Sequence, residues 1–193
     1  FTQGTTAKEQ INSAFTQAKK VEKSTQFHFE IGSNYFLELA KLKAFRILWE
    51  HETGNTPYLF ATTTLENKES DNPYNNILRT TTECISAIFG GANAIMINSY
   101  NHSFEIPTEF SERIARNQQT ILRKESYLDK VTDPVKGSYY IDYLVSELLA
   151  GFKLGIHSVI PENNTGIWMS PEQIEVKNQY SKADLSNIKH LNF

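Results

Sequence analysis

The chain has 193 residues, of which 39% are hydrophobic and 12% aromatic, a composition typical of one globular domain. Its formal net charge is -3, and it contains no long basic run, which argues against a nucleic-acid partner. No apolar stretch is long enough to cross a membrane, and the first residues lack the features of a signal peptide. We therefore expect a cytoplasmic protein without membrane contact. Because the chain starts at Phe1 rather than Met, we also expect it to be part of something longer.

Helical periodicity alternates with short apolar runs along the first 152 residues. Helices are predicted over 5–22, 33–51, 72–90, 109–126 and 138–152, and strands over 25–31, 57–64 and 92–100. Residues suited to capping precede three of these helices: Ser33 or Asn34, Asp71 or Asn72, and Thr108. Pro73 fits a first helical turn. Gly90 and Gly91 are expected to end the third helix through a left-handed residue.

The alternation of strands and helices predicts an α/β fold with parallel strands and right-handed helical crossovers. A closed barrel of eight such units needs about 250 residues, so three strands make either a small open sheet or the later part of a (β/α)8 barrel. We expect this domain to occupy residues 1–152. Residues 153–193 are polar and rich in Asn, Ser, Gly and Pro, which predicts an extended arm with one short helical turn over 182–188.

Mainly neutral hydrogen-bonding residues stand at the predicted carboxyl ends of the strands, where a parallel βα array carries its active groups. They are Glu30, Gly32, Ser33 and Asn34; Thr62, Thr63 and Thr64; and Asn98, Ser99, Tyr100, Asn101 and His102. Asn and Thr suit positioning better than proton transfer, because neither titrates near neutral pH. The histidines share no metal-ligand spacing, and the single Cys84 excludes a cysteine zinc site. No catalytic, cofactor-binding or metal-binding residue is predicted from this chemistry.

The start of the third helix, "DNPYNNILRTT" (71–81), is unusually polar. Asn75, Asn76 and Arg79 occupy its first two turns. One interpretation is a solvated helix start with a surface arginine. The other is a polar contact to another chain or to the absent half of a barrel, for which the planar fork of Arg79 is well suited.

Four runs together resemble the methylmalonyl-CoA mutase family of adenosylcobalamin-dependent acyl-CoA mutases. They are "IGSNYFLELAKLKAFRILW" (31–49), "DNPYNNILRTT" (71–81), "IPTEFSERIARNQQTILRKES" (106–126) and "DPVKGSYYIDYL" (133–144). The resemblance implies the later part of a (β/α)8 barrel. It also implies an isomerase that interconverts succinyl-CoA and methylmalonyl-CoA, in propionate metabolism, with adenosylcobalamin as cofactor.

The chain departs from that family where catalytic chains carry substrate-facing residues. Phe60 and Thr62 stand where the resemblance expects His and Gln, Met96 stands where it expects His, and Ser24 and Gln26 replace an Arg and a Ser. The family's Asp-x-His-x-x-Gly cobalamin signature is absent from this sequence. The resemblance is therefore closest to a small, non-catalytic subunit, which forms a heterodimer with a catalytic subunit. Acyl-CoA and cofactor would be bound through that partner.

Further interface or structural residues are expected outside the polar helix start. Arg116 and Asn117 lie within the family-like run 106–126, and Trp168 opens a segment (168–185) that is similar to the beginning of the family's catalytic chain. Two alternatives stay open. The chain could be an active mutase piece that needs complementation by the missing parts, or a non-enzymatic βα binding module.

Overall fold

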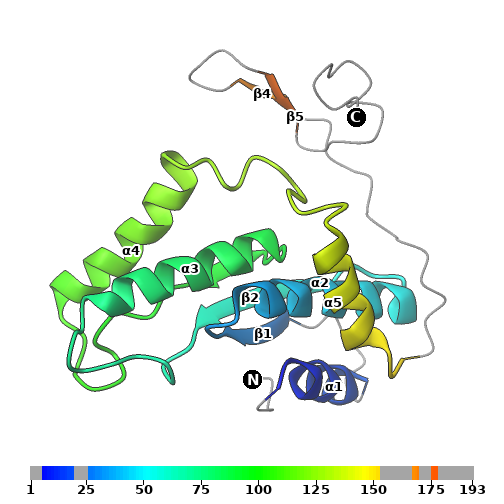
Figure 1. The fold of residues 1–193 in the computed structure, drawn as a ribbon, viewed down its shortest axis with the longest axis horizontal. Helices are drawn as coiled ribbons and strands as arrows, with labels where there is room; N and C mark the ends of the chain where they lie inside the picture. The colour runs from blue at the N-terminus through cyan, green and yellow to red at the C-terminus, as the bar shows by residue number, and fades with distance from the viewer. Residues whose placement is uncertain (1–5, 20–25, 153–166, 170–174, 178–193) are drawn as a thin grey trace.

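The computed structural model describes residues 6–19, 26–152, 167–169 and 175–177 (Figure 1). Its helices are α1 (Ala7–Ala18), α2 (Tyr35–Thr53), α3 (Asn75–Phe89), α4 (Glu109–Lys124) and α5 (Tyr139–Leu149). Its strands are β1 (Gln26–Ile31), β2 (Tyr58–Thr63), β3 (Ala94–Met96), β4 (Ile167–Met169) and β5 (Glu175–Lys177). The order of these elements up to α4 confirms the predicted alternation of strands and helices.

The first three strands form one parallel sheet in the order β1-β2-β3. His28 lies opposite Phe60, and Phe60 lies opposite Ala94 in the next strand. Each step from one strand to the next passes through a helix, as parallel pairing requires. This is an α/β fold that corresponds to part of a βα barrel, and β1 and β3 are the two edges of the sheet within the described residues.

Helices cover one face of the sheet and build the core there. Phe27, Phe29 and Leu59 point to that face and are almost completely buried. Phe27 packs against Phe45 of α2 with ring centroids 4.5 Å apart, and Phe29 packs against the same ring at 5.0 Å. The helix α2 is apolar around most of its circumference, which fits its position in contact with α1, α3, α5 and the sheet.

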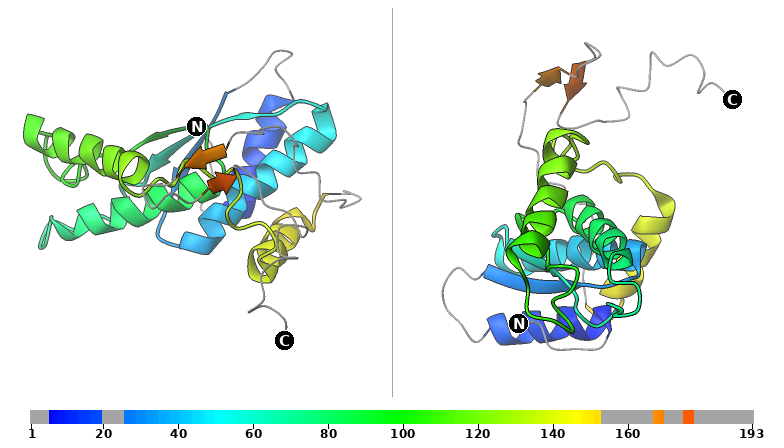
Figure 2. Two further views of the ribbon diagram at one scale, coloured as in Figure 1. Left: turned by 90° about the horizontal axis from the view of Figure 1, so that it is seen from above. Right: turned by 90° about the vertical axis from the view of Figure 1, so that its left-hand side faces the viewer.

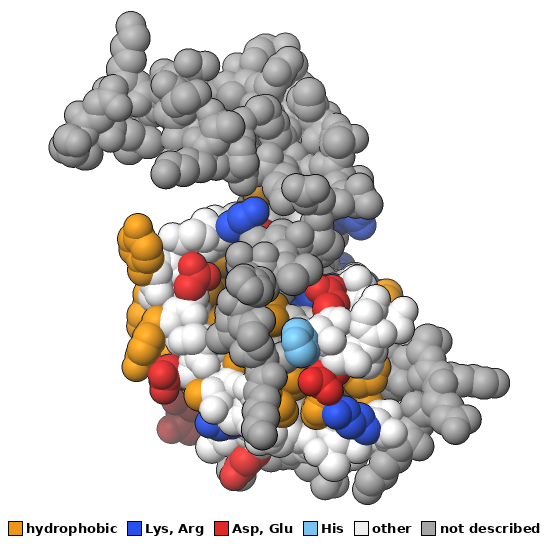
Figure 3. All heavy atoms as spheres, turned by 90° about the vertical axis from the view of Figure 1, so that its right-hand side faces the viewer, with side chains coloured by type: hydrophobic (Ala, Val, Ile, Leu, Met, Phe, Trp, Pro, Cys, Tyr) orange, Lys and Arg blue, Asp and Glu red, His pale blue; other side chains and the backbone are white. Residues whose placement is uncertain are grey.

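The helices lie at two ends of this layer. Figures 1 and 2 show α3 and α4 side by side toward one end and α1 and α5 toward the other, with α2 between them. The buried side chain of Gln118 joins α4 to α3, because its Nε2 donates to Ile77 O at 2.8 Å and to Thr81 Oγ1 at 2.7 Å. On the face seen in Figure 3, exposed hydrophobic side chains are scattered between charged ones.

Most helix ends agree with the predicted caps, but α3 does not. Asn34 and Thr108 cap α2 and α4 through their side chains, and Gly91 has the left-handed φ of +83° expected after α3. The prediction of Asp71 or Asn72 as the cap of α3 is wrong. Residues 72–74 form a turn in which Asn75 N donates to Asn72 O, and the helix begins only at Asn75.

The third strand is shorter than predicted, with Ala94–Met96 instead of 92–100. In the predicted arm, β4 pairs antiparallel with β5 and Trp168 lies opposite Val176; this pairing was not predicted. The expected helical turn over 182–188 lies outside the described residues, and the division into a domain and an arm stays a prediction. No helix in the described part of the chain is long and apolar enough to span a membrane.

Candidate functional site

The second face of the sheet, called here the open face, has no helix of the described structure packed on it. Alternation along the strands places eight residues there: Gln26, His28 and Glu30; Tyr58, Phe60 and Thr62; Ala94 and Met96. Tyr58 and Met96 are 48% and 46% exposed. In a closed barrel this face would line the interior, and substrate chemistry would be sought at the carboxyl ends of its strands.

One polar contact crosses the open face. His28 Nε2 lies 2.6 Å from Thr62 Oγ1, and the imidazole ring also packs against Phe60 with centroids 4.9 Å apart. Burial lowers the pKa of His28, and the carboxylate of Glu30 opposes this effect. The imidazole is therefore mainly neutral at pH 7. In this geometry the ring of His28 has both a hydrogen-bond partner and an aromatic neighbour within the sheet.

A fully buried lysine supports the carboxyl end of β1 from the covered side. Lys41 Nζ donates to Glu30 O at 2.6 Å and to Gln10 Oε1 at 2.7 Å, and it forms an ion pair with Glu38. Burial lowers the pKa of Lys41, and the charge of Glu38 opposes this shift. Lys41 thus fixes α1, α2 and the end of β1 together. Sequence reasoning did not single it out, because a lysine in a helix is most often exposed.

The loop that follows β2 is held by a buried ion pair. Lys68 Nζ lies 2.9 Å from Glu83 Oε1, and both side chains are almost inaccessible to solvent. Asn67 Nδ2 donates to the same carboxylate oxygen and to Ser33 Oγ, each at 2.7 Å. Desolvation lowers the pKa of Lys68 and raises that of Glu83, while their mutual contact acts against both shifts. The network links the loops after β1 and β2 to α3.

The polar start of α3 serves a second network, centred on Asn76. This side chain is fully buried. Its Nδ2 donates to Glu69 O and Tyr100 O at 2.9 Å, and its Oδ1 accepts from Glu69 N at 3.1 Å and Arg79 Nη1 at 2.7 Å. Arg79 also pairs with Glu69 Oε2 at 2.8 Å. Asn76 therefore joins the loops that follow β2 and β3.

The other residues singled out from sequence are not brought together with this network. Asn75 is exposed beside it, and Arg116 and Asn117 are exposed on α4. Arg116 Nη1 lies 3.7 Å from Glu112 Oε2 within the same helix. Trp168 is in β4. The assignment of these residues, and of Arg79, to an interface stays a prediction.

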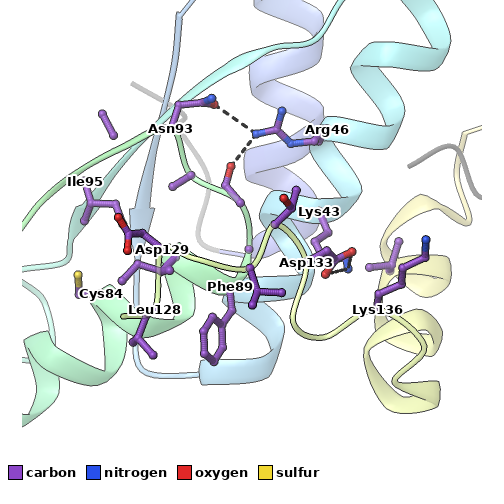
Figure 4. A pocket seen from close by; sticks show the side chains of 18 of the residues that line it. Lys43, Arg46, Cys84, Phe89, Asn93, Ile95, Leu128, Asp129, Asp133 and Lys136 are labelled. Carbon is purple, nitrogen blue, oxygen red and sulfur yellow. Dashed lines mark hydrogen bonds and ion pairs between the residues drawn. The ribbon is translucent and has the colours of Figure 1, made fainter. Parts of the chain in front are cut away.

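A pocket of about 1080 Å³ lies at the opposite, amino-terminal end of β3 (Figure 4). Arg46 crosses it to donate to Gly91 O at 2.6 Å and to Asn93 Oδ1 at 3.2 Å. Lys43 pairs with Asp133 at 2.7 Å. Cys84 lines the same pocket, and burial raises the pKa of its thiol to about 12, so it is not a reactive thiol. The sequence did not indicate this pocket, because its walls come from distant segments.

These arrangements position loops and do not assemble a cluster of reactive groups. Among the described residues there is no group of three or more His, Cys, Asp or Glu side chains that could hold a metal ion. The polar groups at the carboxyl ends of the strands are mostly engaged with one another. Asn98 N, for example, donates to Thr63 Oγ1 at 2.9 Å.

The parallel sheet, its helical crossovers and its open face define part of a βα barrel, and sequence comparison identifies the barrel. Residues 5–167 match the methylmalonyl-CoA mutase family, so the chain belongs to that family and the resemblance is confirmed.

Three relatives illustrate the match. The Rhizobium meliloti methylmalonyl-CoA mutase is 42% identical over 131 residues, 63% of this chain and 18% of that protein. The Porphyromonas gingivalis methylmalonyl-CoA mutase small subunit is 37% identical over 150 residues, 72% of this chain and 24% of that protein. The mitochondrial methylmalonyl-CoA mutase of Homo sapiens is 36% identical over 132 residues, 63% of this chain and 18% of that protein. The chain thus spans a quarter or less of the length of these relatives.

Proposed function

We propose that this chain is a non-catalytic segment of a methylmalonyl-CoA mutase small subunit, and that its work is the structural support of a catalytic mutase chain in a cytoplasmic heterodimer. Isomerisation of succinyl-CoA and methylmalonyl-CoA would then take place on the partner. The proposal is supported by the family, by the similarity to a protein named as a small subunit, and by the side chains of the open face.

The side chains on the open face are the main support for a non-catalytic role. Among its described residues there is no Lys or Arg, and the only acidic residue is Glu30. An acyl-CoA carries phosphates, whose usual partners are Arg and Lys. Stabilisation of a developing charge on its thioester oxygen would need hydrogen-bond donors aimed at that atom. Phe60 and Met96 cannot supply such donors.

Adenosylcobalamin is assigned to the partner for a similar reason. The open face presents one imidazole, and the His28 ring is hydrogen-bonded to Thr62 and packed against Phe60. The sequence also lacks the Asp-x-His-x-x-Gly signature that the family resemblance attaches to this cofactor. The described residues therefore do not fit a corrinoid site, and no reaction step is derived through one.

The alternative, an active mutase piece that needs complementation, is favoured by the same imidazole. A neutral His28 held by a hydroxyl group is a suitable donor or acceptor for a substrate oxygen. That function would require His28 to contact substrate when the missing parts are added. The third possibility, a non-enzymatic βα binding module, predicts no association with mutase chains.

Association with a mutase chain tests the proposal. The tagged chain is mixed at micromolar concentration with the Rhizobium meliloti methylmalonyl-CoA mutase, and complex formation is measured by pull-down and by sedimentation. We expect a complex, and Arg79→Ala should weaken it more than it lowers the free energy of unfolding. The control is Arg123→Ala, which removes an arginine from a more exposed ion pair, that with Asp129. Absence of association for the unmodified chain would overturn the proposal.

Turnover measurements distinguish a non-catalytic segment from an active mutase piece that needs complementation. With adenosylcobalamin and methylmalonyl-CoA added to the complex, we expect His28→Ala in this chain to leave the rate of succinyl-CoA formation unchanged. A loss of turnover with intact association would instead show that this chain is the active piece.

A further inference from the structure

The pocket at the amino-terminal end of β3, called here the β3 pocket, is large enough to hold a small organic molecule. Its volume is about 1080 Å³, and ligand pockets are typically about 300–1,000 Å³. Much of its wall is apolar and comes from α3, β3, α4, the loop after α4, and α5: Ile88, Phe89, Ile95, Leu122, Leu128 and Val145. This wall allows an apolar group of a ligand to be buried.

Most of the charged side chains that line the β3 pocket are already neutralised or solvated. Lys43 forms an ion pair with Asp133 at 2.7 Å, and Arg123 forms one with Asp129 at 3.2 Å. Two further charged residues are exposed to solvent, namely Lys136 and Asp142. The charged residues that remain in the wall are both on α2, and they are Arg46 and Glu50.

Arg46 and Glu50 lie one helical turn apart, but neither forms an ion pair with a described residue. Arg46 extends toward the residues that follow α3, where its Nη2 donates to Gly91 O at 2.6 Å and to Asn93 Oδ1 at 3.2 Å (Figure 4). Its Nε and Nη1 donate to no residue in the described part of the chain. The guanidinium group therefore retains donors for an anionic partner.

Glu50 lacks a partner of the opposite kind. Its Oε1 is buried and has no hydrogen-bond partner among the described residues. Buried polar atoms are nearly always hydrogen-bonded, so an exception calls for an explanation such as a missing partner. Burial lowers the pKa of Arg46, and the charge of Glu50 opposes this shift, so the two charges are close enough to act on each other. The wall thus offers donors and an acceptor near each other, beside an apolar surface.

We propose that the β3 pocket binds an α-amino acid with a large apolar side chain. The carboxylate of the ligand accepts hydrogen bonds from Arg46, its ammonium group donates to Glu50 Oε1, and its side chain packs on the apolar wall. One carbon atom of the ligand carries both charged groups, which suits two side chains one helical turn apart. A ligand with a single charge would be attracted by one of these residues and repelled by the other.

This site lies away from the place where mutase chemistry would be sought. The β3 pocket is at the amino-terminal end of β3 and is bordered by α2, α3, α4 and α5, whereas substrate chemistry belongs to the carboxyl ends of the strands. The inference is therefore independent of the proposed function, and its failure would leave that proposal unchanged.

Isothermal titration calorimetry with the full chain tests the site. The probe is L-phenylalanine, and we expect it to bind with a Kd below about 1 mM. Three controls each lack one recognised group: 3-phenylpropionate lacks the ammonium group, 2-phenylethylamine lacks the carboxylate, and glycine lacks the apolar side chain. Each should bind about tenfold more weakly or worse. Absence of binding by L-phenylalanine, or equal affinity for 3-phenylpropionate, would overturn the inference.

Substitution of the acceptor supplies the second test. Glu50→Gln keeps the size of the side chain and removes its charge, so the affinity for L-phenylalanine should fall by about tenfold or more. The free energy of unfolding should not fall, because Glu50 Oε1 has no partner among the described residues. The matched control is Glu52→Gln, on the same helix but outside the pocket lining, and it should leave the affinity unchanged. Unchanged affinity for Glu50→Gln, or equal losses for the two variants, would overturn the site.

Discussion

The two faces of the three-stranded sheet are built from neighbouring residues of the same strands, yet they differ in almost every physical property. Phe27, Phe29 and Leu59 on the covered face are buried against α2, whereas Tyr58 and Met96 on the open face are about half exposed. The difference indicates that the buried apolar contacts that stabilise the sheet lie mainly on its covered face. We therefore expect substitutions on the open face to lower the free energy of unfolding less than substitutions on the covered face.

The strongest test compares the loss of stability when one phenylalanine on each face of the sheet is replaced by alanine. Phe29→Ala removes a fully buried ring from the core beside Phe45 and should lower the free energy of unfolding by about 3–5 kcal/mol. Phe60→Ala removes a partly exposed ring from the open face and should cost about 1 kcal/mol or less. Urea denaturation followed by circular dichroism measures both. Equal losses would show that something covers the open face in solution.

The polar contacts at the carboxyl ends of the strands should make the next largest contribution to the free energy of unfolding. Glu83→Ala leaves Lys68 as a buried cation without its carboxylate, so we expect a loss of about 3 kcal/mol in the free energy of unfolding. Replacing both partners at once, with Lys68→Met and Glu83→Leu, should restore most of that loss. A double variant that is less stable than Glu83→Ala alone would contradict the buried-pair explanation.

Asn76 gives a sharper test, because an exposed asparagine precedes it. Asn76→Ala leaves three backbone groups of Glu69 and Tyr100 without the partner that the fully buried amide supplies. We expect a loss of about 2 kcal/mol and faster amide exchange in the loop over 65–74. Asn75→Ala should change the free energy of unfolding by less than about 0.5 kcal/mol. Similar losses for the two variants would return Asn76 to the surface role considered from sequence.

The order of the helices and strands could be predicted from the sequence, whereas these side-chain contacts could not. The reasons are physical. Apolar periodicity is local, so it placed α2 and β2 within a few residues, and the capping side chains of Asn34 and Thr108 act within their own first turn. The partners of Lys41, Lys68 and Asn76 come from other elements and depend on the packed fold. Near Asn72 the turn that delays α3 competes with the expected cap, and both use the same kinds of residue.

The predicted length of β3 was wrong for a related reason. The run 92–100 is apolar enough for a strand, but a strand is defined by its neighbours, and β3 has one neighbour in the described residues. On the open face, the family resemblance drew attention to Phe60, Thr62 and Met96 as departures from substrate-facing residues, and the structure places all three on this face. Sequence reasoning did not expect Thr62 to be the hydrogen-bond partner of His28, because the register between β1 and β2 cannot be read from either strand alone.

The smallest expected effect concerns the contact between His28 and Thr62 on the open face. Burial lowers the pKa of His28, so the unfolded chain binds a proton more readily than the folded chain below about pH 6.5. The free energy of unfolding should therefore fall as the pH is lowered through that value, and His28→Gln should flatten this part of the dependence. His51→Gln, at an exposed position, is the control. If the free energy of unfolding depends on pH in the same way for the unmodified chain and for His28→Gln, the pKa of His28 is not lowered by folding. The two faces would then differ in packing but not in polarity at this position.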